Sequence, residues 1–150
     1  MVRLIMGANG AGKTKQLIDL IHNAVEAENG SVVCVEAKST MTFDLHYHVR
    51  LISAYEYDLS NYEALRGFLF GLYAGNYDIS HIFIDNLFKI TGGECNQAAA
   101  DFLKALQKLS IPVRNWKSET FGFSFSLTSF EEYQLREELT EEMNIHFIRN

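Results

Sequence analysis

Short apolar runs alternate along this chain with longer segments in which apolar residues recur at helical spacing. The runs have the length and the β-branched composition of buried strands. They lie at residues 2–6, 31–37, 81–85, 121–128 and 145–149, and residues 49–57 have a similar composition. The longer segments predict helices from Lys13 to just before Gly30, over 62–76, over 96–109 and up to about Met143. Strands and helices are therefore expected to alternate along the whole length.

Local residue patterns indicate where these helices begin or end. Gly30 stands where a left-handed residue often closes a helix. Ser60 with Glu63, and Ser129 with Glu132, match the capping box, in which a serine and a glutamate three residues later satisfy the first amides of a helix. We expect these residues to bound the helices.

Three glycines at positions 67, 71 and 75 fall four residues apart and so share one face of the predicted helix. We expect this face to pack closely against the sheet or a neighbouring helix, because glycine adds no side chain between them. The apolar run 67–75 is far below the ~20 residues that cross a bilayer, so no membrane span is predicted.

Alternation of strands and helices favours a mostly parallel sheet with helices on both faces. We predict an α/β protein of three layers, α/β/α. With 150 residues, the chain is expected to form a single domain over residues 1–150.

A net charge of −6 argues against a nucleic-acid partner, since such binding depends on clustered lysine and arginine. The two cysteines, Cys34 and Cys95, make neither a disulfide framework nor a paired metal motif. Free thiols and the lack of a signal segment at the start of the sequence lead us to expect a cytoplasmic protein.

A glycine-rich turn between the first predicted strand and helix carries the main candidate chemistry. Its residues match G-x-x-x-x-G-K-[ST], and they are Gly7, Ala8, Asn9, Gly10, Ala11, Gly12, Lys13 and Thr14. The glycines allow backbone N–H groups to gather around phosphate oxygens, at the positive end of the following helix. Lys13 would reach the terminal phosphates, and the Thr14 hydroxyl would coordinate Mg²⁺.

Asp85 directly follows the apolar run at 81–84 and is the candidate for the acid that holds the metal's water shell. The alternative is a cap for a helix or turn, since aspartate often ends a strand for that reason.

With this loop and this aspartate, the sequence resembles the P-loop NTPase superfamily, through the Walker A pattern at residues 7–14 and by layout elsewhere. The resemblance implies the P-loop NTPase fold, with ATP or GTP bound together with Mg²⁺ and Asp85 as the second metal partner. No N-K-x-D segment for reading guanine is present in the sequence, so ATP is the expected nucleotide.

Within that superfamily the order of elements is similar to type II thymidine kinases, and the chain also resembles short stand-alone P-loop proteins of bacteria. Those kinases follow the aspartate with glutamate, whereas Asn86 follows Asp85 here. They also carry a four-cysteine zinc site, which two cysteines cannot build.

Hydrolysis or phosphoryl transfer needs a group that orients or deprotonates the nucleophile, and with Asn86 beside Asp85 this group must lie at another position. Glu36, at the end of the second predicted strand, is the first candidate beside Lys13, and an exposed strand-end carboxylate is the alternative. Asp44, His46 and His48 alternate and would line one face of an extended strand, either as a second metal site or as plain surface residues. Further candidates named by position alone are Ser126 and Thr128 as phosphate sensors, and Arg50, Arg114 and Arg149 as charge stabilisers.

We therefore expect an ATP- and Mg²⁺-binding protein with slow hydrolase activity, whose nucleotide state is transmitted to a protein partner. A nucleoside-type small-molecule kinase is the alternative enzyme. A third possibility is an interaction module that binds nucleotide without hydrolysing it.

Overall fold

The computed structural model describes residues 2–8, 10–27, 30–38, 44–76, 78–93, 96–110, 122–127 and 133–147, and these contain one six-stranded sheet. The strands are β1 (Val2–Met6), β2 (Ser31–Glu36), β3 (Arg50–Ser53), β4 (Ile79–Ile84), β5 (Gly122–Leu127) and β6 (Asn144–Phe147). Their order is β3-β2-β4-β5-β1-β6, and every neighbouring pair is parallel. All six carboxyl ends therefore lie at the same edge.

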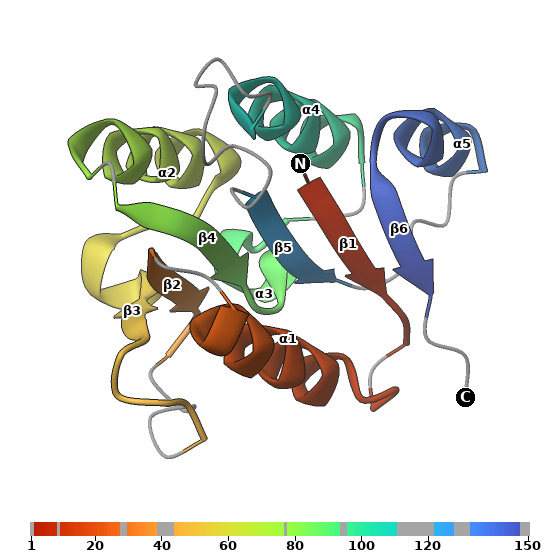
Figure 1. The fold of residues 1–150 in the computed structure, drawn as a ribbon. Coiled ribbons are helices and arrows are strands. Elements are labelled where there is room, and N and C mark those ends of the chain that lie inside the picture. The colour runs from red at the N-terminus through yellow and green to blue at the C-terminus, as the bar shows by residue number, and fades with distance from the viewer. Residues whose placement is uncertain are drawn as a thin grey trace.

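Helices cover both faces of this sheet (Figure 1). They are α1 (Lys13–Ala27), α2 (Tyr62–Gly75), α3 (Leu87–Thr91), α4 (Gln97–Ser110) and α5 (Tyr133–Glu142). Helix α1 lies on one face, and α2, α4 and α5 lie side by side on the other. The prediction of a three-layer α/β/α fold with a parallel sheet is confirmed. None of the described helices is both long and apolar enough to cross a bilayer.

The strands form continuous apolar runs because both of their faces are buried. In β2, Val33 and Val35 join the larger core beneath α2 and α4, while Val32 and Cys34 join the smaller core beneath α1. Side chains of successive strand residues point to opposite faces, so one strand supplies both cores.

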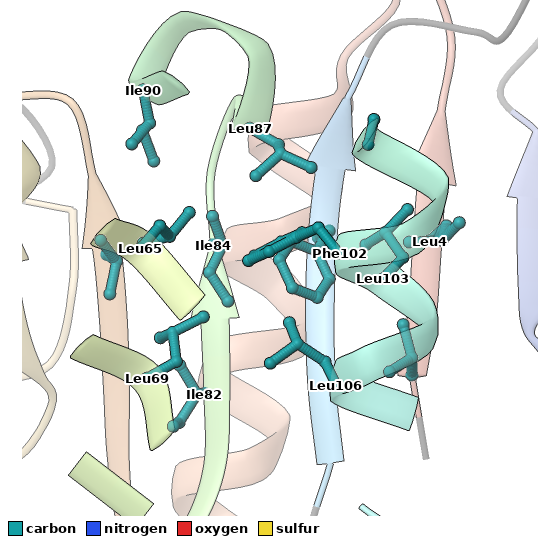
Figure 2. Packing of buried hydrophobic residues seen from close by; sticks show 14 of the residues in the cluster. Leu4, Leu65, Leu69, Ile82, Ile84, Leu87, Ile90, Phe102, Leu103 and Leu106 are labelled. Carbon is teal, nitrogen blue, oxygen red and sulfur yellow. The ribbon is translucent and has the colours of Figure 1, made fainter. Parts of the chain in front are cut away.

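The larger core is built from branched aliphatic side chains of β1, β4, α2 and α4 around two phenylalanines (Figure 2). The Phe102 ring of α4 meets the Phe125 ring of β5 edge-on, with centroids 5.9 Å apart. Leu87 and Ile90 of α3 join the same core at the carboxyl edge of the sheet. This packing fixes the segment that follows β4, where Asp85 lies.

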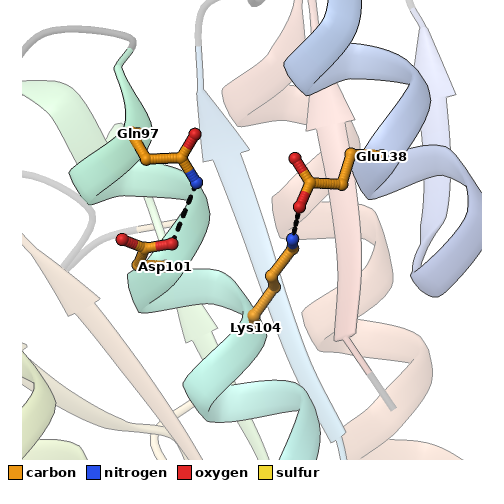
Figure 3. Close-up of polar contacts among 4 residues, drawn as sticks. All are labelled: Gln97, Asp101, Lys104 and Glu138. Carbon is orange, nitrogen blue, oxygen red and sulfur yellow. Dashed lines mark hydrogen bonds and ion pairs between the residues drawn. The ribbon is translucent and has the colours of Figure 1, made fainter.

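Polar contacts also lie along α4 and between α4 and α5 (Figure 3). Gln97 Nε2 donates to Asp101 Oδ1 at 2.9 Å within α4, and Lys104 forms an ion pair with Glu138 of α5. Lys104 and Glu138 are both half-buried, and such surface pairs stabilise a fold by about 1 kcal/mol at most. Lys104 of α4 thus neutralises part of the negative charge on the surface of α5.

Two predicted boundaries are wrong. The strand expected over 49–57 ends at Ser53, and residues Ala54–Tyr57 form a 3₁₀ helix closed by Asp58 in the left-handed conformation. Helix α2 is capped by Asn61, whose side-chain oxygen accepts from Ala64 N at 2.8 Å, and not by Ser60. A capping residue one place later satisfies an amide one place later, that of Ala64 in place of Glu63. Ser129 and Glu132 lie outside the described residues.

The expected close packing of Gly67, Gly71 and Gly75 is also wrong. All three are exposed, and a Cβ added at any of them would meet no atom within 4 Å. The buried face of α2 is formed instead by Leu65 and Leu69. Four-residue spacing places the glycines on one face but does not say which face turns inward.

Gly30 is required for a different reason from the one predicted. It is not among the described glycines with positive φ, so it does not close α1 in the left-handed conformation. A Cβ at this position would lie 2.5 Å from the Asp78 carbonyl oxygen and 2.6 Å from Ser80 Cβ. The backbone approaching β4 leaves no room for a side chain.

We predict that Gly67→Ala and Gly71→Ala each raise the free energy of unfolding by about 0.5–1 kcal/mol, because alanine costs less backbone entropy in an open helical position. Gly30→Ala is the matched control and should lower it by roughly 1–3 kcal/mol through overpacking. Urea unfolding of the three variants measures both effects. A loss of stability at the α2 positions would contradict the exposed face.

Candidate functional site

Residues 7–12 leave the carboxyl end of β1 as a loop, and α1 begins at Lys13. Gly10 has a φ of 81° and Gly12 a φ of 93°, both in the left-handed region that favours glycine. The segment is therefore a loop whose backbone favours glycine at positions 10 and 12, and not a continuous helix. Asn9 lies outside the described residues.

Hydrogen bonds define how the loop enters the helix. Ala11 N donates to the Ala8 carbonyl at 3.1 Å, and Gln16 N donates to the Gly12 carbonyl at 3.1 Å. The Gly12 carbonyl thus accepts the first helical hydrogen bond. The amides of that turn that come before Gln16 precede the first helical hydrogen bond and lie at the positive end of the helix dipole, which together suit an anion.

Lys13 turns back over the loop. Its Nζ donates to the Gly7 carbonyl at 2.7 Å and to the Ala8 carbonyl at 2.9 Å. Partial burial lowers the pKa of this ammonium, and the nearby Asp85 carboxylate opposes that shift. A positive charge is therefore held at the mouth of the loop by two carbonyl oxygens.

Thr14 and Asp85 are 71 residues apart in sequence and meet at this edge. The Thr14 hydroxyl donates to Asp85 Oδ1 at 3.1 Å, and Asp85 N donates to the Val35 carbonyl at 2.9 Å. The alternative role of Asp85 as a helix cap is not supported, because the N-cap of α3 is Asn86. A hydroxyl and a carboxylate side by side are the hard oxygen ligands that Mg²⁺ prefers, so these residues fit that ion.

Ser126, at the end of β5, is the link that sequence analysis missed. Its hydroxyl donates to Asp85 Oδ1 at 2.6 Å and accepts from Asn86 N at 2.7 Å, and the residue is 1% exposed. The position was named only as a phosphate sensor. The contact with Asp85 depends on β5 lying between β4 and β1, and no residue pattern displays that order.

Glu36 ends β2 and is 3% exposed, so the alternative of an exposed strand-end carboxylate is wrong. By strand alternation it shares the α1 face with Cys34. The strand that carries it neighbours β4, with Val35 opposite Ile84, and Asp85 follows directly. Two carboxylates therefore lie at the ends of adjacent strands, and Asp85 is the one with a hydrogen bond to Thr14.

Other candidates lie away from this group. Asp44, His46 and His48 are exposed and do not lie in a strand, and the His46 ring stacks on the rings of Tyr47 and His48. No group of three metal-ligating side chains occurs among the described residues. Arg50 begins β3 at the amino edge, opposite the loop. Three candidates fall outside the described residues: Arg114, Thr128 and Arg149.

The parallel sheet, with a glycine loop joining its first strand to a helix, defines a P-loop NTPase-like fold. Among solved structures, the flagellar accessory protein FlaH from Methanocaldococcus jannaschii is similar, with a TM-score of 0.60 and 11% sequence identity over 94% of this chain and 67% of that one. At this identity the likeness concerns the fold alone. No protein-family model and no curated protein sequence matches the chain.

The pKa of the Cys34 thiol depends on its burial and on the charges at this edge of the sheet. It is fully buried, and burial, followed by the negative charges of Asp85 and Glu36, raises the pKa of its thiol. A raised native pKa contributes stability that is complete below the unfolded-state pKa of about 8.5 and declines by about 1.4 kcal/mol per pH unit above it.

We therefore predict that the stability advantage of the native chain over Cys34→Ala shrinks between pH 8 and pH 10. Other titrating groups are common to both proteins and cancel in the difference. Urea unfolding of both proteins at several pH values measures it. A difference that stays constant over this range would mean that the thiolate is tolerated in the folded chain.

Proposed function

We propose that this chain binds ATP with Mg²⁺ at residues 7–14 and hydrolyses it slowly. The observation that carries the proposal is the contact of Thr14 with Asp85, 3.1 Å, beside a loop in which Gly10 and Gly12 have positive φ and over whose mouth the lysine lies. The P-loop NTPase-like fold supports nucleotide binding at this edge.

Each residue has a defined part in this proposal. The amides of residues 10–14 surround the phosphates, and the Lys13 ammonium exchanges its two carbonyl partners for phosphate oxygens. Thr14 and Asp85 would hold Mg²⁺, which when bound supplies neutralisation of the phosphate charge. ATP is favoured over GTP by the missing guanine-reading segment in the sequence.

Glu36 is proposed as the base that orients and deprotonates the attacking water. Its burial at the end of β2 and its shared face with Cys34, on the strand beside Asp85, support this role. Turnover should be slow because Asn86, which cannot act as a base, occupies the place directly after Asp85. The nucleotide state would then be passed to a protein partner.

Nucleotide binding is tested by calorimetric titration with ATP and Mg²⁺. We predict that Lys13→Ala weakens binding by about 10- to 100-fold, the cost of losing a charge-assisted bond. Lys15→Ala makes the same change of charge at an exposed position two residues on, and should change affinity by no more than about threefold. No binding by the native chain, or equal binding by the two variants, would contradict the proposal.

Hydrolysis is tested separately by ADP release. We predict that Glu36→Gln keeps ATP affinity within about threefold and lowers the hydrolysis rate by about 100-fold or more, the usual contribution of a general base. Glu56→Gln, an exposed change in the 3₁₀ helix that follows β3 at the same edge, is the control. Equal rates in the two variants would exclude Glu36 as the base.

The same assay distinguishes the two alternatives. ADP release stimulated by one nucleoside in a panel would favour a nucleoside-type kinase. Tight ATP binding with ADP release no faster than the buffer blank would favour an interaction module that does not hydrolyse.

A further inference from the structure

Asp85 Oδ1 accepts hydrogen bonds from two hydroxyls that belong to different layers of the fold. One comes from Thr14 in the first turn of α1, at 3.1 Å, and the other from Ser126 at the end of β5, at 2.6 Å. Hydroxyl bonds to a carboxylate are among the stronger hydrogen bonds in proteins, and the shorter of these two comes from the residue that is fully buried.

The hydrogen-bonding capacity of the Ser126 hydroxyl limits what it can do. A hydroxyl has one hydrogen to donate, and that hydrogen goes to Asp85. One of its lone pairs accepts from Asn86 N at 2.7 Å. Donation to a phosphate oxygen would require the bond to Asp85 to break, so the contacts suit a support for Asp85 better than a phosphate sensor.

The bond to Asn86 extends this support to the backbone. Asn86 has a φ of 55° and a ψ of 64°, a left-handed conformation that costs energy for residues other than glycine and is best tolerated by asparagine and aspartate. It is the first residue after Asp85. One hydroxyl therefore holds both the carboxylate of Asp85 and the turn that carries it away from β4.

We propose that Ser126 is a positioning residue that orients the Asp85 carboxylate toward Thr14 for metal binding. The inference rests on the proposed binding of ATP with Mg²⁺. Ser126 itself touches neither the metal nor the nucleotide. Its hydroxyl holds Asp85 Oδ1 from the sheet, while the Thr14 hydroxyl holds the same atom from α1.

Ser124 provides a matched control. It lies two residues earlier on the same strand and the same face, it is also fully buried, and its hydroxyl is hydrogen-bonded to His81 Nε2 at 2.8 Å. Ser124→Ala and Ser126→Ala therefore remove the same group from equally buried sites, and only the second removes a bond to Asp85.

The experiment compares ATP affinity in Mg²⁺ with ATP affinity in excess EDTA, by calorimetry on the full chain. The ratio of the two isolates the part of binding that depends on the metal. We expect Ser126→Ala to lower this ratio by about tenfold, the effect of one hydrogen bond to a charged group, and Ser124→Ala to leave it within about twofold. Ser126→Cys, which keeps the size but donates weakly, should lower it in the same direction and serves if the alanine variant does not fold.

Each outcome has a separate meaning. A ratio in Ser126→Ala, or in the cysteine variant, equal to that of Ser124→Ala overturns the positioning role and leaves ATP binding intact. Failure of the native chain to bind ATP in either buffer overturns the proposed function, and this inference with it. A tenfold fall confined to the Ser126 variants supports both.

Discussion

The Asp85 carboxylate is the point at which three parts of the fold are tied together. Its Oδ1 accepts from Thr14 at the start of α1 and from Ser126 at the end of β5, while its backbone N–H continues the ladder to β2 through the Val35 carbonyl. A charged group that is partly withdrawn from water requires such partners, because leaving its oxygens unpaired would cost several times what one hydrogen bond contributes. The position of α1, and with it the glycine loop, is therefore coupled to the centre of the sheet.

That coupling depends on the order of the strands. Because β5 lies between β1 and β4, one strand separates the strand that leads into the loop from the strand that leads into Asp85. Ser126 belongs to that intervening strand, and its hydroxyl lies beside Asp85. The two faces of the sheet also differ in character. The face under α2 and α4 is filled by apolar side chains, whereas the α1 face carries Ser124, Ser126 and Glu36 among its apolar residues. Stability is supplied mostly by the first face, which leaves the second able to carry polar groups.

The strands, the parallel sheet and the loop could be predicted from sequence because each depends on local pattern: continuous apolar runs, helical spacing, and glycines where φ must be positive. The Asp85 side chain could be placed near Thr14 because parallel strands end at one edge. Its bond to Ser126 could not, since register and strand order are set by packing between distant segments. Nor could the orientation of α2, whose glycines face outward because Leu65 and Leu69 bury more apolar area on the opposite side. The short helix α3 was missed for the same reason, as its apolar residues are held by the larger core and not by a strong local signal.

The Lys13 ammonium already has hydrogen-bond partners in the loop before any anion binds. Its ammonium is already bonded to two carbonyl oxygens of the loop, so it is neither free nor fully hydrated. The free energy available when it turns to an anion is therefore a difference between two sets of hydrogen bonds, and it is smaller than the direct attraction of opposite charges. Burial lowers the pKa of the ammonium because it penalises the charged form, and the carboxylate of Asp85 opposes that shift by favouring the charged form. A second negative charge at the loop mouth would act in the same direction as Asp85, so anion binding and the protonated state of Lys13 must reinforce each other.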